Sequence, residues 1–586
     1  MDGKTPLGSP SQKRQARQPR WRTLAWVVAA LLLWYILIPR LHYRLRPIAC
    51  HNMTQVTYEG ESVLWERCGE ITGHPLECAN VTVPMNHFAP TNSSQANAKD
   101  KVFIIPLIRM RAKNATQNLI INPGGPGGSG IGMVYAQGDE INTILNEGYH
   151  ILSFDPRGVN GSIPKAECYP DEETRRAKSR PHRGGTLSDT GEMYAWNKNL
   201  ARACYETMGE HAKYINTPQT AADMNSILDA LGQEDMIYWG FSYGTTLGQT
   251  YATMYPERSK RVVIDGVSNI FDTYKRLDTE QKMLSDSDRV LYGFFDECAK
   301  AGPDRCALAS FGETAEELRD VVLSRVDELR DEPLSVYVNS TLYGTFDYPE
   351  FLTNAIFYSL YAPKKSWVPF AEQLAKFLNG NSTDIWMEHG RADVFASIGE
   401  ANRFITFNDA KSGPEYWPQD RQAVVDEMVR VTNRRGSLFS RIDMSGFFGR
   451  QQWLIPHTHD FVPKEKVETA HPLLILTTSY DPICPIKGAL VARDIFLGSQ
   501  IIESKAYGHC SDAMPSLCVA RHVKAYFDEG TVPENYTTCE IDGEYFPSGE
   551  ADSDVLNSRG LLSTEDPEME RIHMAQSRLA QKWPTW

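Results

Sequence analysis

Short apolar runs alternate with longer helical patterns along most of this chain. Such runs, three to five residues long, are typical of buried strands, and they occur at residues 118–121, 150–154, 236–239, 262–264, 473–476 and 500–503. Residues 217–231 and 245–255 instead repeat their apolar positions at helical spacing. Strands that alternate with helices predict a mostly parallel sheet covered by helices, begun by residues 68–84 and 101–110.

The pattern changes between about residue 270 and residue 445. Helical periodicity dominates there, as in residues 313–329 and 348–378, without strongly alternating strands. A chain of 586 residues is long enough for several domains or for one enlarged domain. Because the candidate chemistry lies on both sides of this stretch, we expect one α/β domain with a large, mainly helical cap inserted into it.

The expected division of the chain has six parts. They are a cytosolic basic tail at 1–22, a signal-anchor transmembrane helix at 23–41, a first core part at 60–270, a helical cap at 271–445, a second core part at 446–545 that carries an acid and a base, and a polar tail at 546–586.

The pentapeptide Gly-Phe-Ser-Tyr-Gly at 240–244 is the strongest chemical signal. It matches G-x-S-x-G, it follows the apolar run 236–239, and it opens the helical pattern 245–255. That context places Ser242 on a tight strand-to-helix turn, where a serine hydroxyl is exposed as a nucleophile. A serine in an ordinary glycine turn is the alternative, and three further segments argue against it.

A glycine-rich loop at residues 122–130 follows the run 118–121 directly. In hydrolases with such a turn, the oxyanion of the reacting carbonyl is bound by the N–H after the nucleophile and by an N–H of a glycine loop. The first would come from Tyr243, and the second from Gly125 or, as second choice, Gly124. A phosphate-binding loop is disfavoured because the Lys-Ser/Thr pair that ends such a loop is absent.

A nucleophilic serine needs a histidine to take its proton and a carboxylate to orient that histidine. Asp481 follows the strand-like run 473–476, and His509 follows the run 500–503, so both lie at strand ends. In hydrolases with such a turn, the chain order is serine, then acid, then histidine, and Ser242, Asp481 and His509 follow that order. Asp265, which also ends a strand-like run, is the alternative acid.

Residues 24–38 form an almost uninterrupted apolar run near the N-terminus, which Trp21 and Leu41 extend toward the length of a membrane span. More Lys and Arg residues precede the run than follow it, which keeps the N-terminus cytosolic. Pro39 and Arg40 stand where a signal peptidase site would lie. We expect a single-pass type II membrane protein with its catalytic part lumenal or extracellular; the alternative is secretion after signal cleavage.

An oxidising, glycosylating compartment suits the rest of the chain. The 11 cysteines fit such a compartment, with local pairs Cys68 with Cys78, Cys168 with Cys204 and Cys298 with Cys306 as plausible disulfides. Glycosylation is expected at the sequons Asn52, Asn80, Asn92, Asn114, Asn339, Asn381 and Asn535. A further sequon at Asn160 lies near the predicted catalytic loops and is left out of this set.

The charge distribution excludes some classes of partner. The first 50 residues carry nine Lys or Arg and one Asp, so the net charge of −14 for the whole chain leaves −22 for the remainder. An acidic body disfavours binding to nucleic acid. No cysteine and histidine spacing of zinc type occurs, and neither a metal nor a cofactor is expected.

Taken together, these motifs resemble the tripeptidyl aminopeptidase-like branch of the α/β-hydrolase superfamily, which is itself similar to proline iminopeptidases. The likeness spans most of residues 60–545. It depends on the motifs at 78–84, 122–130, 155–158, 240–245 and 263–266 and on the steps Asp481-Pro482 and Gly508-His509. The resemblance implies that Ser242, Asp481 and His509 form a catalytic triad and that Asp265 is structural.

Proteins of this family release short peptides or single residues from free N-termini, which requires a carboxylate for the substrate's ammonium group. Glu400 and Asp409 are the candidates, because residues 400–409 resemble the family's cap segment. The chain departs from the pattern there: Phe407 replaces a cysteine, and 449–453 lacks its partner. Two further disulfides are hypothesised, Cys484 with Cys510 across the active-site rim and Cys518 with Cys539.

The predicted function is a serine hydrolase that works through an acyl-enzyme, with peptide N-termini as its expected substrates. An esterase or lipase acting on small acyl esters is the first alternative, because the same triad serves both reactions. A noncatalytic surface module on a hydrolase fold is the second alternative. The intact set of Ser242, Asp481 and His509 argues against it.

Overall fold

The computed structural model describes residues 55–90, 101–113, 115–178, 187–275, 283–390, 398–433, 437–440, 444–548 and 567–583. The chain divides into a unit at 1–54 and a unit at 55–586, and every described residue belongs to the second. The predicted anchor and the sequons Asn52, Asn92 and Asn114 therefore lie outside the described residues. Within the described ranges, no helix has the length and apolar character needed to cross a membrane.

A ten-stranded sheet forms the centre of the second unit, in the order β1-β2-β3-β5-β4-β6-β7-β10-β11-β12. The strands are β1 (Glu66–Ile71), β2 (His74–Pro84), β3 (Val102–Met110), β4 (Asn118–Asn122), β5 (His150–Phe154), β6 (Met236–Phe241), β7 (Ser259–Asp265), β10 (Leu474–Tyr480), β11 (Gln500–Tyr507) and β12 (Thr537–Cys539). The β1–β2, β2–β3 and β3–β5 pairs are antiparallel, and the remaining pairs of this sheet are parallel. The predicted mostly parallel sheet is confirmed.

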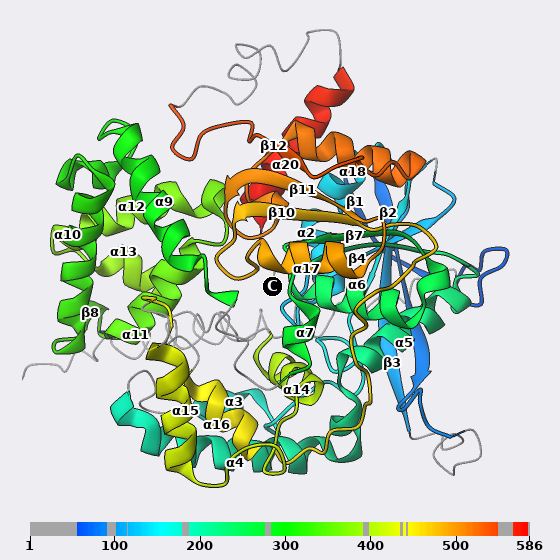
Figure 1. The fold of residues 1–586 in the computed structure, drawn as a ribbon, viewed down its shortest axis with the longest axis horizontal. Helices are drawn as coiled ribbons and strands as arrows, with labels where there is room; N and C mark the ends of the chain where they lie inside the picture. The colour runs from blue at the N-terminus through cyan, green and yellow to red at the C-terminus, as the bar shows by residue number, and fades with distance from the viewer. Residues whose placement is uncertain are drawn as a thin grey trace, which may run out of the picture. The chain divides into compact units, whose positions relative to one another are not determined.

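Helices cover both faces of this sheet (Figure 1). The described helices of the α/β core are α2 (Gly130–Ile144), α3 (Glu172–Lys178), α4 (Thr190–Met208), α5 (Thr217–Ala230), α6 (Tyr243–Met254), α7 (Ile270–Thr273), α17 (Lys487–Ile495), α18 (Leu517–Glu529) and α20 (Pro567–Lys582). Successive strand residues point to opposite faces, so Ile120 joins the apolar cluster under α5, α6 and α17, whereas Leu119 and Ile121 join the cluster under α2, α18 and α20. This two-sided burial explains why the strands appear in the sequence as continuous apolar runs.

A mainly helical insertion separates β7 from β10. It contains α9 (Ser287–Ala301), α10 (Ala315–Asp327), α11 (Tyr348–Glu350), α12 (Pro363–Leu378), α13 (Thr383–Ile385), α14 (Gly399–Asp409), α15 (Arg421–Asn433) and α16 (Met444–Gln452). A π-helical segment, Phe351–Phe357, precedes α12. Part of the insertion has an apolar core of its own, with Phe294 and Trp367 fully buried in it.

One hairpin in the insertion departs from the expectation that it lacks strands. Strands β8 (Leu334–Asn339) and β9 (Leu342–Phe346) pair antiparallel, apart from the main sheet. Tyr337 and Tyr343 stand opposite each other and are 69% and 66% exposed. Because few residues of this hairpin are buried, its sequence lacks the regular alternation by which a half-buried strand is recognised.

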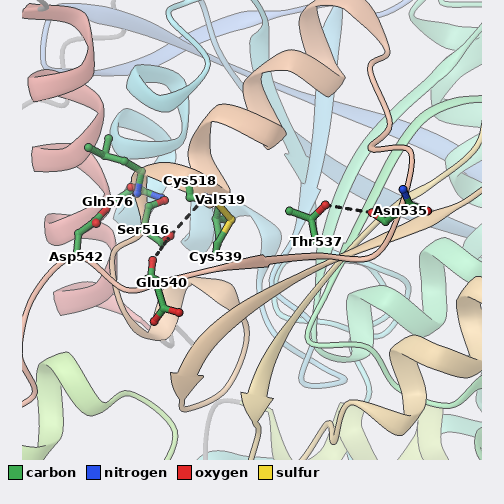
Figure 2. Close-up of a disulfide and its surroundings, with 10 residues drawn as sticks. Ser516, Cys518, Val519, Asn535, Thr537, Cys539, Glu540, Asp542 and Gln576 are labelled. Atoms are coloured by element: carbon green, nitrogen blue, oxygen red, sulfur yellow. Dashed lines mark hydrogen bonds between the residues drawn. A yellow bond between two sulfur atoms is a disulfide. The ribbon is translucent and has the colours of Figure 1, made fainter. Parts of the chain in front are cut away.

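Four disulfides join the described residues. Cys68–Cys78, Cys168–Cys204, Cys298–Cys306 and Cys518–Cys539 are all bonded, and these predicted pairs are confirmed. Figure 2 shows the last, which ties α18 to β12. Beside it, the Ser516 hydroxyl donates to the carbonyl of Glu540 at 2.7 Å, and the Gln576 side chain of α20 donates to the carbonyl of Ser516 at 2.9 Å.

The predicted Cys484–Cys510 disulfide is wrong. Both residues are buried free thiols. The Cys510 thiol donates to the carbonyl of Asp265 at 3.3 Å, whereas the Cys484 thiol lies 3.6 Å from the hydroxyl of Ser268. The two side chains are thus engaged with different neighbours, although both flank the same acid and base in sequence.

Helix α20, in the polar C-terminal region, packs against the core through a buried apolar face. Ile572, Ala575 and Leu579 are buried on it, and α2 is its main neighbour. Just after the helix, the fully buried Trp583 donates from its indole N–H to the carbonyl of His509 at 2.9 Å. A segment near the end of the chain therefore supports the backbone of a candidate catalytic residue.

Candidate active site

Ser242 occupies a sharp turn between β6 and α6. Its backbone has φ 56° and ψ −124°, a conformation that non-glycine residues rarely adopt. The turn is tight enough that a Cβ on Gly240 would lie 2.4 Å from the carbonyl oxygen of Gly244, which explains the glycine at that position. The Ser242 N–H donates to the carbonyl of Asp265 at 2.9 Å, so the end of β7 holds the turn in place.

Asp481 and His509 meet through a direct hydrogen bond. Nδ1 of His509 lies 3.0 Å from Oδ1 and 2.9 Å from Oδ2 of Asp481, and both side chains are completely buried. Because a carboxylate can only accept, Nδ1 carries the hydrogen. Asp481 also accepts backbone N–H groups from Ile483 at 2.9 Å, Cys484 at 2.8 Å and Cys510 at 3.1 Å. These bonds fix the carboxylate, and through it the imidazole.

The topology brings Ser242 to the same edge of the sheet. Strands β6, β7, β10 and β11 are parallel neighbours, and the three residues follow the carboxyl ends of β6, β10 and β11. Cys484 links them physically. Its thiol interacts with the side chain of Ser242, and its Sγ lies within 4.8 Å of a carboxylate oxygen of Asp481 and a ring nitrogen of His509.

Asp265, the alternative acid, points to a different partner. Its carboxylate accepts the N–H of Ser511 at 2.7 Å and the hydroxyl of Ser511 at 2.6 Å. Burial raises the pKa of Asp265 to about 6. The pKa of Asp512, buried nearby, is raised well above its usual range, also by burial. Asp265 thus holds the turn after His509 rather than the imidazole itself.

The glycine loop lies directly against the serine turn. A Cβ on Gly124, whose φ is +89°, would fall 2.9 Å from the N of Tyr243 and 3.0 Å from the Cβ of Ser242, so only glycine fits there. The Gly124 N–H donates to the Asn122 side chain at 3.0 Å. Among the hydrogen bonds of the described residues, none is donated by the N–H of Gly125 or Tyr243. Those two N–H groups therefore remain available to another acceptor.

A pocket of about 490 Å³ opens beside Ser242, which is ample for a short peptide or a small ester. The α/β core contributes the glycine loop, Ser242 and Tyr243, and the helical insertion contributes side chains from its π-helical segment, α14 and α16. The insertion residues on its wall include Phe357, Tyr358, Tyr361, Asn402, Arg403, Phe407, Asp409, Met444, Phe447 and Arg450. The wall is therefore aromatic and apolar with a few charged groups.

Two family models match the chain. The model described as "alpha/beta hydrolase fold" matches residues 117–301, which hold the glycine loop and Ser242, and the model described as "TAP-like protein" matches residues 450–539, which hold Asp481 and His509. The chain has the α/β-hydrolase fold. The second match confirms its predicted resemblance to the tripeptidyl aminopeptidase-like branch.

Several named relatives are similar to this α/β-hydrolase over most of their length. A tripeptidyl aminopeptidase of Streptomyces lividans is 26% identical over 81% of this chain and 86% of its own. The serine protease Hip1 of Mycobacterium tuberculosis is 24% identical over 82% of this chain and 91% of its own. Carboxylesterase B of Mycobacterium tuberculosis is 26% identical over 81% of this chain and 89% of its own.

The two candidate carboxylates for a substrate ammonium group lie in different surroundings in this α/β-hydrolase. Asp409 lines the pocket and accepts from the N–H of Thr217 at 2.7 Å and from its hydroxyl at 2.6 Å. The Thr217 hydroxyl also contacts the Tyr243 hydroxyl, which connects Asp409 to the residue after the candidate nucleophile. Glu400 is not among the pocket residues and accepts the N–H of Cys168 at 2.6 Å.

Burial shapes the charge of both carboxylates. It raises the pKa of Asp409 to about 7, against the lowering effect of the Thr217 hydrogen bonds and of Arg450. It also raises the pKa of Glu400, which the Cys168 N–H partly offsets. Asp409 therefore changes its charge near neutral pH, inside the pocket.

Sequence reasoning missed three residues that contact the site of this hydrolase. The sequence suggests a disulfide for Cys484, whereas its position three residues after Asp481 is the signal that places it at the site. Thr217 begins α5 far from the motifs, and Trp583 lies in a polar region, so neither carried a local signal. Long-range packing alone brings them to the site.

Proposed function

We propose that this α/β-hydrolase is a serine peptidase that removes short peptides or single residues from free peptide N-termini. The observation that supports it most is the His509–Asp481 hydrogen bond together with Ser242, which stands on a strained turn and lines the pocket of about 490 Å³. A serine, a histidine and a carboxylate in this relation are what nucleophilic acyl transfer requires. The relatives named tripeptidyl aminopeptidase and serine protease support a peptide substrate.

In the proposed mechanism, Nε2 of His509 takes the proton of the Ser242 hydroxyl as the serine oxygen attacks the peptide carbonyl. Asp481 stabilises the imidazolium through Nδ1. The N–H groups of Tyr243 and Gly125 bind the oxyanion, with Gly124 as the second choice for the glycine donor. His509 then protonates the leaving amine, and a water molecule hydrolyses the acyl-enzyme along the reverse path.

The substrate's N-terminal ammonium group is proposed to bind Asp409. This carboxylate lies on the pocket wall and is linked through Thr217 to Tyr243, next to Ser242. Because the distance between Asp409 and Ser242 is fixed, it determines how many substrate residues lie between the bound ammonium group and the cleaved bond, and so how many residues are released. Glu400, which is bonded to the Cys168 backbone, is the second candidate.

An esterase of small acyl substrates is the second candidate function. The relative named carboxylesterase B and the mainly aromatic and apolar pocket wall favour it. The two functions share Ser242, Asp481 and His509 and differ in what occupies the pocket beyond the reacting carbonyl. Asp409 therefore decides between them.

A matched pair of substrates tests the proposal. Tripeptidyl and aminoacyl arylamides with a free N-terminus should be hydrolysed, and the same compounds with an acetylated N-terminus should be cleaved far more slowly. Both activities should disappear in Ser242→Ala. Hydrolysis of p-nitrophenyl esters without any cleavage of the free arylamides would establish the esterase instead, and no hydrolysis of either would leave only a noncatalytic module.

The proposed location is the membrane of the secretory pathway or the cell surface, through the predicted span at 23–41. Four disulfides among the described residues suit an oxidising compartment. The sequons at Asn80, Asn339, Asn381 and Asn535 are on exposed residues and are proposed to carry glycans. The Asn160 side chain instead donates to Asp155 at 2.8 Å and to Ser129 at 3.2 Å, which suits its exclusion from that set.

A further inference from the structure

Cys484 is a buried thiol at the centre of the catalytic pocket. Only 2% of its surface is exposed, and it lines both the pocket beside Ser242 and an adjoining pocket of about 750 Å³. The N–H donated to Asp481 at 2.8 Å fixes its backbone. Its Sγ lies 3.6 Å from the hydroxyl of Ser268 and interacts with the side chain of Ser242. The thiol therefore has a fixed position and belongs to the wall of both pockets.

His509 is oriented as histidines are in zinc sites. Metal-binding histidines usually donate one ring N–H to a carboxylate and bind the ion with the other nitrogen. Here Nδ1 is held by Asp481 at 2.9 Å, which leaves Nε2 as the ring nitrogen that would bind a metal. Asp481 itself accepts three backbone N–H groups besides the imidazole, which suits a supporting role rather than direct ligation.

We propose that Cys484 and His509 form a zinc-binding site inside the catalytic pocket and that Zn²⁺ inhibits the enzyme reversibly through it. A thiolate and an imidazole are the ligands that Zn²⁺ prefers, and on one tetrahedral ion they stand about 3.5 Å apart. Sγ of Cys484 and a ring nitrogen of His509 lie within 4.8 Å of each other, so small side-chain movements would bring the thiolate and the imidazole to this spacing. The thiol releases its proton to solvent on binding, and water completes the coordination.

Inhibition follows from the position of the ion, and this part rests on the proposed function. Zinc bound to Nε2 blocks the atom that must take the proton of Ser242. It also stands where the serine oxygen approaches the imidazole, so that attack on a carbonyl stops. The zinc-binding part stands independently, because it needs only the side chains of Cys484 and His509.

Two readouts on the purified protein test the proposal. Calorimetric titration with ZnCl₂ should show one site per chain, and arylamide hydrolysis should fall at least tenfold at saturating ZnCl₂ and recover when EDTA is added. Cys484→Ala should raise the zinc concentration for half-inhibition tenfold or more, as expected for the loss of a ligand. Cys510→Ala is the matched control, because Cys510 is also a buried thiol near the triad but its Sγ donates to the carbonyl of Asp265.

The outcomes separate the site from the function. Equal zinc sensitivity in wild type and Cys484→Ala, or loss of zinc binding in Cys510→Ala alone, would overturn the proposal. Cys484→Ser, which keeps the size and a hydroxyl, serves if the alanine variant does not fold, and it should also lose zinc binding. Zinc binding at one site per chain in a protein that hydrolyses nothing would keep the metal site and reject the proposed function.

Discussion

Asp409 is the residue that we propose to bind the ammonium group of the substrate. Burial raises its pKa to about 7, so that it loses its negative charge as the pH falls through neutrality. The α-ammonium group of a peptide has a pKa of about 7.7–8.0 and is charged below it. The ion pair between them is therefore strongest in a narrow range just above pH 7, if Asp409 is the group that binds the substrate amine.

A substrate ratio isolates this effect from the titration of His509. We expect kcat/KM for a free-N-terminus arylamide, divided by kcat/KM for an ester without an amine, to fall as the pH drops below about 7. The same triad acts on both substrates, so its own pH dependence cancels in the ratio.

Asp409→Asn should abolish the fall of this ratio at low pH. It should also lower kcat/KM for the free-N-terminus arylamide by about 10–100-fold, the cost of losing a charged hydrogen bond. The asparagine carbonyl can still accept the Thr217 N–H, which limits structural damage. Glu400→Gln is the control and should leave the ratio unchanged. A ratio that is independent of pH in the wild type would remove Asp409 from substrate binding.

At the residue scale, the sequence predicts those site residues whose identifying features are their neighbours in sequence. Ser242 is identified by glycines two positions away and by a strand and a helix on either side. The contacts of Asp409 with Thr217, and of Thr217 with Tyr243, join positions about 190 and 26 apart in sequence and have no local signature. The Cys484–Cys510 error had the same origin, because nearness in sequence to the acid and the base says nothing about the direction of each thiol.

Helix α20 is the element whose contribution the sequence concealed. Its composition is polar, yet Ile572, Leu579 and the following Trp583 are buried against the core. Trp583 packs with Phe241 at 5.2 Å between ring centroids and donates to the carbonyl of His509 at 2.9 Å. This helix therefore couples the stability of the C-terminal region to the backbone of His509, the proposed catalytic base.

Trp583→Ala should lower the free energy of unfolding by about 3–5 kcal/mol, the usual cost of deleting a fully buried tryptophan. Urea denaturation measures that loss. Trp583→Phe should recover most of the stability while still lacking the indole donor, so that any remaining fall in kcat reports the His509 contact.

Met574→Ala provides the matched control on the same helix, because Met574 is 50% exposed. Its free energy of unfolding should change by less than about 0.5 kcal/mol. A loss at Trp583 no larger than that at Met574 would show that α20 does not support the core.

The β8–β9 hairpin illustrates a different limit of sequence reasoning at the element scale. Burial on both faces makes the strands of the main sheet conspicuous, whereas in β8 only Val336 is buried. A strand held by main-chain hydrogen bonds and exposed tyrosines has little hydrophobic pattern to recognise. The parallel core could be predicted because its burial is regular, and the hairpin could not because its burial is slight.

At the scale of the whole molecule, the distribution of charge along the chain bears on the predicted location of the protein. The basic segment before the apolar run 24–38 and the acidic remainder are what a chain with a cytosolic tail and a lumenal or extracellular body would carry. Fold class was predictable from the alternation of strands and helices. The anchor depends on composition alone, since its residues lie outside those that the structure describes.

Fractionation tests the anchor. The full chain expressed in a eukaryotic host should stay with membranes after an alkaline carbonate wash, and a version in which a cleavable signal peptide replaces residues 1–48 should be secreted in soluble form. Treatment with a peptide N-glycosidase should lower the apparent mass of both. Release of the full chain by carbonate would contradict the anchor and favour secretion after cleavage.

In the proposed mechanism, His509 and Asp481 activate the Ser242 hydroxyl. Reaction with a fluorophosphonate, followed by mass spectrometry of the digested protein, measures this activation. We expect one adduct per chain, located on Ser242, absent from Ser242→Ala and formed at least a hundredfold more slowly in His509→Ala. An adduct on another residue, or equal labelling of the wild type and Ser242→Ala, would contradict it.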